Sequence, residues 1–390
     1  MSDANQVAIS YEIESTWGTD PDDTSQKINF TSESLKGETG STRSASIRDD
    51  RQTPDIIRNS LRANGDINVE WQIDAYDDLL EGLLMADTGF DSETTVISAA
   101  TTVSFTQTTT ISTTGTWTSE PDDGDWIVVQ TASGVNDGYY KVASALSNSI
   151  TITAGSVSTE GAGQLVTIKA LSAETQGTTA KYFYIRRSYL DLNADGDVAA
   201  GYPGMMVDGW NLSVGADAVV TGGFSFLGQK EESLTDGPDN GFTAASTDPI
   251  INGIDHVKKV RLGAYDLDAV GFTLNMKNNL RERLKIGTLG AYSIGMGTVE
   301  VSGTITAYFD NSNTLAAVGA HLNWADPAAY FALEDGTSGM VIEIPNVKIT
   351  SAPRVVSGIN TDVMAELAFE AFVGPSGNAE TIRICKGSAS

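Results

Sequence analysis

The sequence predicts an all-β protein with a minor helical content, and three observations support this. Short runs in which apolar and polar residues alternate recur along the chain, bounded by Gly, Asn and Asp. They cover residues 67–73, 126–130, 150–154, 211–214, 223–227, 299–308, 347–349 and 367–372. The composition combines 40% hydrophobic residues and 39 Gly with only 10 Pro, as in ordered β proteins. Helical patterning is scarce, so we expect antiparallel sheets.

Two segments have the apolar spacing of an amphipathic helix. The first covers residues 76–86 and starts with two aspartates, which favour the positive end of a helix dipole. Its apolar stripe consists of Leu79, Leu80, Leu83 and Leu84. The second covers residues 313–322, where Leu315, Val318 and Leu322 share one face. We expect both faces to be packed.

An internal repeat indicates a duplication. The fourteen residues Gly65–Asp78 resemble Gly297–Asp310, which lie 232 residues further along, and each copy precedes one of the helical segments. Seven positions match, six of them identically: Gly65, Val69, Ile73, Ala75, Tyr76 and Asp78 recur, and Ile67 becomes Val299. The order of residues 210–214 and 224–228 also resembles that of 347–350 and 369–374. The alternative is that long strands in Thr-rich sheets look alike.

The chain divides into three predicted domains. Residues 91–179 are rich in Thr and Ser, poor in helix formers and have four to six short strand patterns, enough for a small barrel or sandwich. We interpret them as an insertion, and insertions are tolerated in exposed loops, so this domain should lie outside. Residues 1–90 with 180–235 form the first host domain, and 236–390 form the second.

The charge is strongly acidic. Fifty-one acidic residues against 24 basic ones give −27, which repels nucleic acid phosphates. Such a balance fits a wall along which DNA moves freely, or the surface of a protein from a halophilic source. We expect no export signal at the start of the chain, no membrane span and a soluble protein. The single cysteine, Cys385, excludes an intramolecular disulfide and a thiolate metal cluster.

The order of several motifs resembles that of the major tail tube proteins of long-tailed, siphovirus-like bacteriophages and archaeal viruses. The motifs cover most of residues 1–235. They are Val7–Thr19 with its Trp-Gly-Thr turn, the basic segment Arg48–Arg58, Gly65–Glu70, Asp77–Leu80, Gly124–Ile127 with Asn136–Gly138, and Tyr184–Arg187 leading through Gly201 to Phe224. The second half is linked to this family mainly through the internal repeat.

The resemblance implies a virion structural protein with two tandem tail tube β-sandwich or barrel domains and flanking helices. In this family a curved sheet is continued by neighbouring subunits around a ring, and stacked rings enclose a DNA channel. The genome would pass through an acidic channel to the host without tight binding. Tail tip, tape measure and tail terminator proteins would be partners, and the subunit, made in the host cytoplasm, would belong to the virion tail.

Six tail tube units make the usual ring in this family. A chain with two units therefore predicts a ring of three chains with pseudo-sixfold symmetry, and a plain hexamer is the alternative. The inserted domain would decorate the exterior.

Two sets of residues are candidates for roles in the assembly. The loop from Lys36 to Arg62 concentrates positive charge, and in the family a loop here reaches into the next ring. Its arginines are Arg43, Arg48, Arg51, Arg58 and Arg62, whose guanidinium groups could pair with carboxylates of a neighbour. The alternative is a solvated loop. Glu70, Asp74 and Glu300 are the candidates for acidic residues that face the channel.

An Asp-rich segment partly matches a calcium-binding loop. Asp191, Asn193, Asp195 and Asp197 occupy the spacing of the first ligands, with Gly196 at the turn. Position twelve is Tyr202 instead of Glu, and no helices are predicted on either side. The interpretations are an Asx-rich hairpin loop or a calcium site, and no other cofactor is expected.

The sequence contains no pattern that indicates an enzyme. The two histidines, His256 and His321, lie in unrelated contexts, and the glycine-rich stretch Gly287–Gly295 lacks the lysine of a phosphate loop. We therefore predict no catalytic residues. A competing function is a cell-surface, adhesin-like β-sandwich protein, which would also be acidic and Thr-rich. The expected lack of an export signal argues against it.

Overall fold

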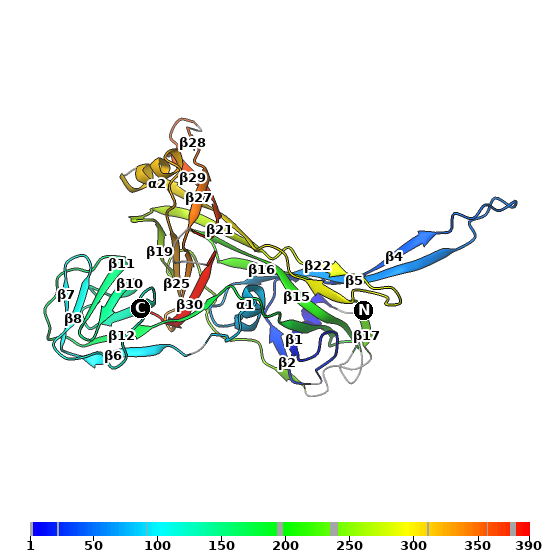
Figure 1. Cartoon of the computed structure of the whole chain (residues 1–390), viewed down its shortest axis with the longest axis horizontal. Helices are drawn as coiled ribbons and strands as arrows, with labels where there is room; N and C mark the ends of the chain where they lie inside the picture. The colour runs from blue at the N-terminus through cyan, green and yellow to red at the C-terminus, as the bar shows by residue number, and fades with distance from the viewer. Residues whose placement is uncertain are drawn as a thin grey trace.

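The computed structural model describes residues 3–21, 23–90, 92–192, 198–234, 241–309, 312–356, 358–374 and 380–390. It confirms the predicted fold class, because strands dominate and two α-helices accompany them (Figure 1). The helices are α1 (Asp77–Leu84) and α2 (Ser312–Leu322), preceded by a short 3-10 helix at Ala4–Gln6. No described helix has the length and apolar character needed to cross a membrane.

The largest sheet has 15 strands and runs through the centre of the molecule. Its strands are β1 (Val7–Glu14), β2 (Ser25–Ile28), β3 (Ser32–Glu33), β4 (Lys36–Arg43), β5 (Ile56–Glu70), β14 (Tyr182–Tyr189), β15 (Val198–Gly215), β16 (Thr221–Gly228), β17 (Glu232–Leu234), β18 (Phe242–Thr243), β21 (Ala269–Lys277), β24 (Glu300–Tyr308), β27 (Val347–Ser351), β28 (Arg354–Val355) and β29 (Met364–Ala371). The 18-residue strand β15 pairs with β14 along its first part and with β16 and β21 along its second part.

Two smaller sheets belong to the second half of the chain. A six-stranded sheet contains β13 (Ser172–Thr175), β30 (Arg383–Ser388), β26 (Ser338–Ile344), β25 (Ala329–Glu334), β19 (Val257–Leu262) and β20 (Tyr265–Asp266). A two-stranded sheet contains β22 (Arg281–Arg283) and β23 (Ser293–Gly295). One continuous hydrophobic core lies between the sheets and joins residues of both halves, from Ile9 to Ile384.

The same strand connectivity occurs twice. We call β1–β5, α1 and β14–β17 the first repeat unit, and β19–β30 with α2 the second repeat unit. In the first unit β1 pairs with β14, β14 with β15, and β15 with both β17 and β16, which pairs with β5. In the second unit β19 pairs with β25, β25 with β26 and β26 with β30, while β27 pairs with β29 and β29 with β24. Chain order is preserved throughout.

The register of the two hairpins differs. Glu38 lies opposite Arg62 in the β4–β5 hairpin, and Glu282 lies opposite Ile294 in the β22–β23 hairpin. Ile294 follows Arg62 by 232 residues, as in the sequence repeat, whereas Glu282 follows Glu38 by 244. Two glycines that recur in the repeat, Gly65 and Gly297, occupy positions without room for a side chain. A Cβ at Gly65 would lie 2.5 Å from the Cα of Leu35, and at Gly297 it would lie 2.2 Å from the carbonyl oxygen of Asn279. Only glycine allows each strand to approach its neighbour so closely.

The predicted helices form, but one predicted face is wrong. In α1 the four leucines of the stripe are buried, as expected. In α2 Val318 is buried, whereas Leu315 and Leu322 are 57% and 71% exposed. Thr314 and Ala317 are buried instead, because this helix packs a narrow strip of small side chains onto the sheet.

The strand predicted for residues 67–73 is shorter in the structure. β5 ends at Glu70, and Trp71, Gln72 and Ile73 are all buried in the following turn. Consecutive side chains of a strand point to opposite faces, so three successive buried residues do not fit a strand with one solvated face. Packing of Trp71 against Tyr76, Trp210 and Phe224 decides the local backbone course.

The inserted segment forms one seven-stranded sheet with its own core. Its strands are β6 (Thr94–Ala100), β7 (Val103–Thr106), β8 (Thr110–Thr113), β9 (Trp126–Thr131), β10 (Gly138–Leu146), β11 (Ser149–Ala154) and β12 (Val166–Ala170). The sequence prediction missed the first three, whose Thr-rich alternation is weak.

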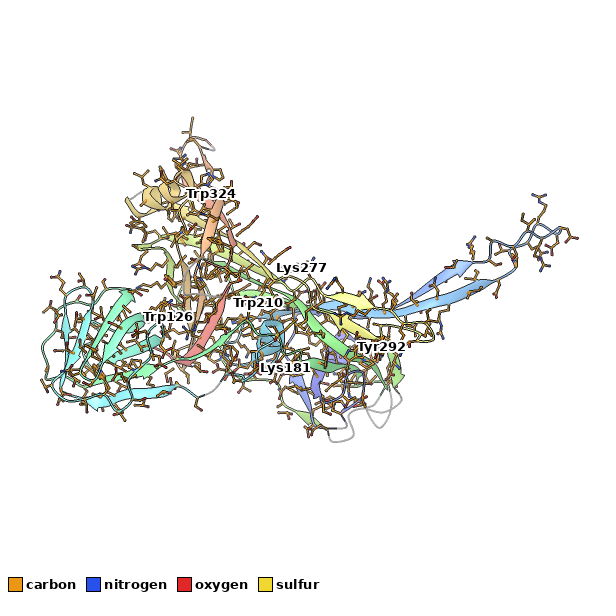
Figure 2. All side chains as sticks on the ribbon, viewed as in Figure 1. Trp126, Lys181, Trp210, Lys277, Tyr292 and Trp324 are labelled. Carbon is orange, nitrogen blue, oxygen red and sulfur yellow. The ribbon has the colours of Figure 1, made fainter. Side chains whose placement is uncertain are left out.

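The insert docks onto the second repeat unit, although it is inserted in the first. A shared apolar cluster joins it to the six-stranded sheet, and Figure 2 shows Trp126 at this boundary. Trp126 donates a hydrogen bond to Glu343 over 2.7 Å, and the Tyr139 hydroxyl donates one to Glu334 over 3.1 Å. Strand β13, at the exit of the insert, pairs with β30. These contacts fix the insert to the second repeat unit.

We expect Ile305→Ala to lower the free energy of unfolding by about 2–5 kcal/mol, because Ile305 is fully buried in β24 and its truncation leaves a cavity. The adjacent Thr304 points to the opposite, polar face of the strand, so Thr304→Ala should change stability by less than about 0.5 kcal/mol. Urea unfolding of both variants measures the difference. Equal losses in the two variants would contradict this placement of the core.

We expect Cys385 to be unreactive in the folded protein. The thiol is fully buried, and this burial raises its pKa to about 12, so the reactive thiolate is scarce at neutral pH. Reaction with an aromatic disulfide reagent should therefore require denaturant, with one thiol released per chain on unfolding. Rapid stoichiometric labelling under native conditions would show that β30 leaves the sheet.

Candidate assembly surfaces

One face of the central sheet is polar across β5, β16, β15, β21, β24 and β29. On each of these strands alternate side chains enter the core and the others face solvent, so hydrogen-bonded neighbours place polar residues in rows across the sheet. We call this surface the polar face. It contains Asp66, Asn68 and Glu70 of β5, Ser225 of β16, Asn211 and Ser213 of β15, Thr273, Asn275 and Lys277 of β21, Glu300, Ser302, Thr304 and Thr306 of β24, and Glu366 and Glu370 of β29.

The polar face is continuous across the boundary between the two repeat units. Asn211 of β15 lies opposite Asn275 of β21, and Ser213 lies opposite Thr273. Figure 2 shows this boundary, with Trp210 on the second part of β15 and Lys277 at the end of β21. The apolar partners of the same strands, Trp210 among them, point into the common core. The surface is therefore built by both units together.

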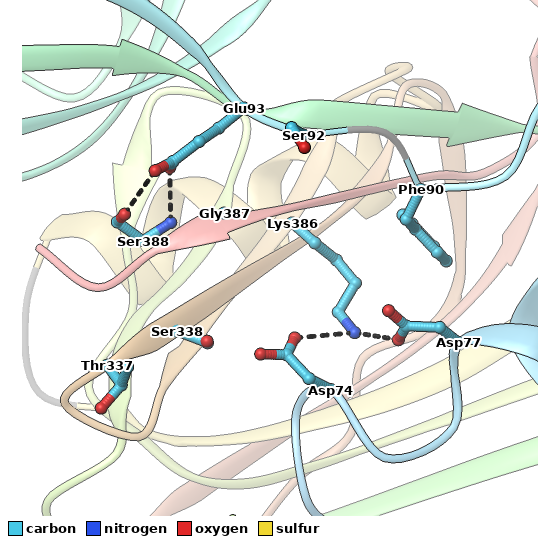
Figure 3. Close-up of a pocket in the computed structure, with 10 residues that line it drawn as sticks. All are labelled: Asp74, Asp77, Phe90, Ser92, Glu93, Thr337, Ser338, Lys386, Gly387 and Ser388. Carbon is cyan, nitrogen blue, oxygen red and sulfur yellow. Dashed lines mark hydrogen bonds and ion pairs between the residues drawn. The ribbon is translucent and has the colours of Figure 1, made fainter.

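The three acidic candidates occupy two different environments. Glu70 and Glu300 lie on the polar face. Asp74 lies in the turn after β5, where its carboxylate is 3.1 Å from the ammonium of Lys386 (Figure 3). Lys386 also pairs with Asp77 at the start of α1 and donates to the carbonyl of Ile73. Asp74 therefore takes part in joining β30 to the first repeat unit.

The candidate arginines lie on a long hairpin that projects away from the body (Figure 1). We call residues 36–62 the long arm. Arg43 is on β4, Arg58 and Arg62 are on β5, and Arg48 and Arg51 are in the connection between these strands. Arg48 pairs with Asp50 over 2.6 Å at an exposed position, where such a pair contributes little. Arg43, Arg51 and Arg58 form no ion pair with any described residue.

Sequence analysis missed a second basic arm. Residues 281–295, which we call the short arm, form β22, β23 and their connection, and they point in the same direction as the long arm (Figure 1). They include the glycine-rich stretch 287–295 and the cations Arg281, Arg283 and Lys285. Three basic residues within five positions of so acidic a chain were a signal in the sequence. The 232-residue shift of the repeat moves residues 36–62 to residues 268–294, which overlap the short arm.

The two arms contact each other near their bases. Arg62 of the long arm pairs with Glu282 of the short arm over 3.0 Å. Burial raises the pKa of Glu282, and the positive charge of Arg62 opposes this rise while Glu38 adds to it. The ion pair thus ties a candidate arginine to the second repeat unit of its own chain, which leaves the other four candidates for contacts elsewhere.

The central sheet is branched, and besides the edge at β18 it has a first edge at β4 and a second edge at β27. At the first edge β4 pairs with β5 alone among the described strands. At the second edge β27 pairs with β29, and its outward groups are partly occupied, because the N–H of Val347 donates to Pro327 and His321 Nδ1 lies 2.6 Å from the carbonyl oxygen of Ile349. Edge strands of this kind are the usual places where another chain is added to a sheet.

The described residues contain no group of His, Cys, Asp and Glu that could hold a metal ion. Asn193, Asp195 and Asp197 lie outside the described residues, so the proposed calcium loop stays a prediction. Asp191 is described, and it accepts a hydrogen bond from the backbone N–H of Asp3 over 2.8 Å. The two histidines lie in unrelated environments. His256 accepts a hydrogen bond from the backbone N–H of Asn252 in a loop, and His321 lies against β27.

Melting scans with and without EDTA separate the two interpretations of residues 191–197. An Asx-rich hairpin loop predicts the same Tm in both scans, because its bonds are made within the chain. A calcium site predicts a lower Tm with EDTA, restored by excess calcium. EDTA with an equal amount of added calcium is the control for ionic effects.

Comparison with known proteins identifies the family of this chain. A family model described as "Phage tail tube protein" matches residues 4–371, which is nearly the whole chain. No curated protein sequence matches it. The match spans both repeat units and the insert, so it covers the polar face and both arms. The chain therefore belongs to the phage tail tube protein family, and it is a structural component of the virion tail that assembles with copies of itself into a tube.

Proposed function

We propose that three copies of this chain form each ring of the tube, with pseudo-sixfold symmetry produced by an internal duplication. The repeated connectivity carries this proposal. Within one chain β15 of the first unit pairs with β21 of the second unit. If units are equivalent, the outer edge at β27 meets the edge at β3 and β4 of the next copy in a related way. Heterologous contacts of this kind close into rings.

The polar face is the surface that we place toward the channel. Its side chains are short hydroxyls and amides with carboxylates of Asp66, Glu70, Glu300, Glu366 and Glu370 among them. A basic wall would hold DNA through many counterion-releasing contacts, one phosphate for roughly every 1.7 Å of duplex axis. An acidic and amide-rich wall avoids these contacts. The genome would therefore pass to the host without tight binding.

Several further roles follow from this function. Tail tip, tape measure and tail terminator proteins would contact the tube at its ends and along its lumen. The insert lies at the end of the molecule away from the long arm, and an exterior position fits it (Figure 1). We propose no catalytic role, because the surfaces that the repeat builds are contact surfaces. A siphovirus-like tail and a halophilic, archaeal host remain predictions from the sequence.

We expect purified protein to form rings with three times the 41.1 kDa of one chain, and tubes when concentrated. Native mass measurement of short assemblies and class averages of tubes viewed down their axis test this. The averages should show six similar lobes that alternate in detail, because the two units differ. Six chains per ring would overturn the trimer, and monomers at every concentration would overturn ring formation.

A further inference from the structure

The side of α2 that faces away from the sheet is apolar and exposed. Leu315 and Leu322 lie on this side, two helical turns apart, with Gly319 between them. Trp324, just beyond the end of the helix, is 60% exposed. We call Leu315, Leu322 and Trp324 the α2 patch. Large apolar side chains gathered in this way are typical of a surface that another protein covers.

The α2 patch adjoins the second edge of the central sheet. His321 of α2 lies against β27, with Nδ1 2.6 Å from the carbonyl oxygen of Ile349. Lys348 of β27 donates a hydrogen bond to the carbonyl of Trp324 over 2.7 Å, and its ammonium lies 5.2 Å from the centre of the indole ring (Figure 2). The helix therefore covers part of this edge, so a chain that is added here must meet α2.

The corresponding helix of the first repeat unit is covered by the second unit. The 232-residue shift of the repeat carries Leu83 of α1 to Leu315 of α2. Leu83 is fully buried, and its carbonyl oxygen accepts a hydrogen bond over 2.8 Å from Nδ2 of Asn278, which follows β21. Leu315 occupies the same place in the repeat and is exposed, because no third unit follows in the chain.

The other leucine of the patch gives the same result. The same shift carries Phe90 to Leu322. Phe90 packs against the core and lies beside Lys386 of β30, whose ammonium is 5.3 Å from the centre of the ring. Both positions of the first unit therefore contact the second unit, whereas both positions of the second unit are exposed. The missing neighbour of α2 is a unit like the one that covers α1.

Strand register identifies the segment of a neighbouring unit that would reach α2. At the end of β21, Lys277 pairs with Glu300 of β24. In the first unit Ser32 of β3 pairs with Asn68, which precedes Glu300 by 232 residues. β3 therefore holds the place of the end of β21, and the segment that contacts α1 in the chain corresponds to residues 29–35 in the first unit.

Residues 29–35 suit an apolar partner. Four of them are exposed, and Phe30 is half-buried. Glu33 is the one charged residue of the segment, and its carboxylate pairs with Arg187 of the same chain over 2.7 Å. A segment whose only charge is already paired can cover leucine side chains without leaving a buried charge alone.

We propose that the α2 patch is covered within the ring by the first repeat unit of a second copy of this chain, through residues 29–35. This inference rests on the proposed ring-forming function, and it names the side chains through which one copy joins the next. One chain contains two similar units and a single β15 to β21 junction, so its α2 side and its β3 side are both left for a neighbour. Two such different surfaces on one chain form a heterologous contact that can close into a ring.

Charge on the α2 patch should prevent ring formation without unfolding the chain. The variant with Leu315→Glu and Leu322→Glu should keep the Tm of the unsubstituted protein, because both side chains are exposed in the single chain. The concentration at which rings form should rise at least about tenfold, because carboxylates would be buried against apolar groups. The matched control, Leu146→Glu with Leu165→Glu, changes two exposed leucines of the insert and should form rings normally. Rings of the α2 variant at the usual concentration would contradict the proposal.

Thiol labelling shows whether the patch is covered. Because Cys385 is buried, Leu315→Cys supplies the one accessible thiol. Free subunits should react rapidly with a maleimide, and isolated rings should react at least about tenfold more slowly. Leu146→Cys should react at the same rate in both states. Equal rates for Leu315→Cys in subunits and rings would overturn the proposal, and so would protection that appears only after rings have stacked into tubes.

A photo-reactive benzophenone amino acid in place of Leu315 identifies the partner segment. In rings assembled from equal amounts of isotope-labelled and unlabelled chains, mass spectrometry distinguishes crosslinks between copies from those within one copy. We expect crosslinks to residues 29–35 of another copy. Crosslinks to the insert or to either arm would overturn the assignment. If the unsubstituted protein forms no rings, the proposed function fails; if rings form and position 315 stays accessible in them, this inference alone fails.

Discussion

The pairing of β15 with β21 is the contact on which the rest of the structure depends. It joins the two repeat units edge to edge over seven residue pairs, from Gly209 opposite Lys277 to Gly215 opposite Gly271. Backbone hydrogen bonds set the register, and the alternation of side chains then places Trp210, Leu212 and Val214 of β15 in one core with Phe272, Leu274 and Met276 of β21. A shift by one residue would move the core residues to solvent. The polar face and the shared core therefore have the same origin.

The units are joined a second time on the far side of this core. Lys386 of β30 lies between Asp74 and Asp77 of the first unit, and β13, which leads out of the insert, pairs with β30. A lysine so deeply buried is tolerated because two carboxylates and a backbone carbonyl surround it. The two similar units are therefore joined at two places, by strand pairing and by a buried ion-pair cluster.

Charge in this protein is segregated by place. The arms are basic, and the polar face combines amides and hydroxyls with carboxylates. The acidic surplus of the chain therefore lies outside the arms. Strong net charge of one sign opposes nonspecific contact between free subunits in solution.

The sequence by itself determined the fold class, the position of α1 and the repeat. Period-two patterns and turn residues identified most strands of the central sheet, and the buried leucine stripe identified α1, because these signals are local. The family assignment followed from the order of short motifs, and the family match over residues 4–371 confirmed it.

Only the tertiary structure decided which surfaces those elements build. Alternation does not say which neighbour a strand pairs with, so the β15 to β21 junction and the polar face could not be derived from sequence. The exposure of Leu315 and Leu322 depends on what packs beneath α2, and the end of β5 depends on the aromatic cluster around Trp71. The docking of the insert onto the second unit, and the contact between the two arms, come from residues far apart in the chain.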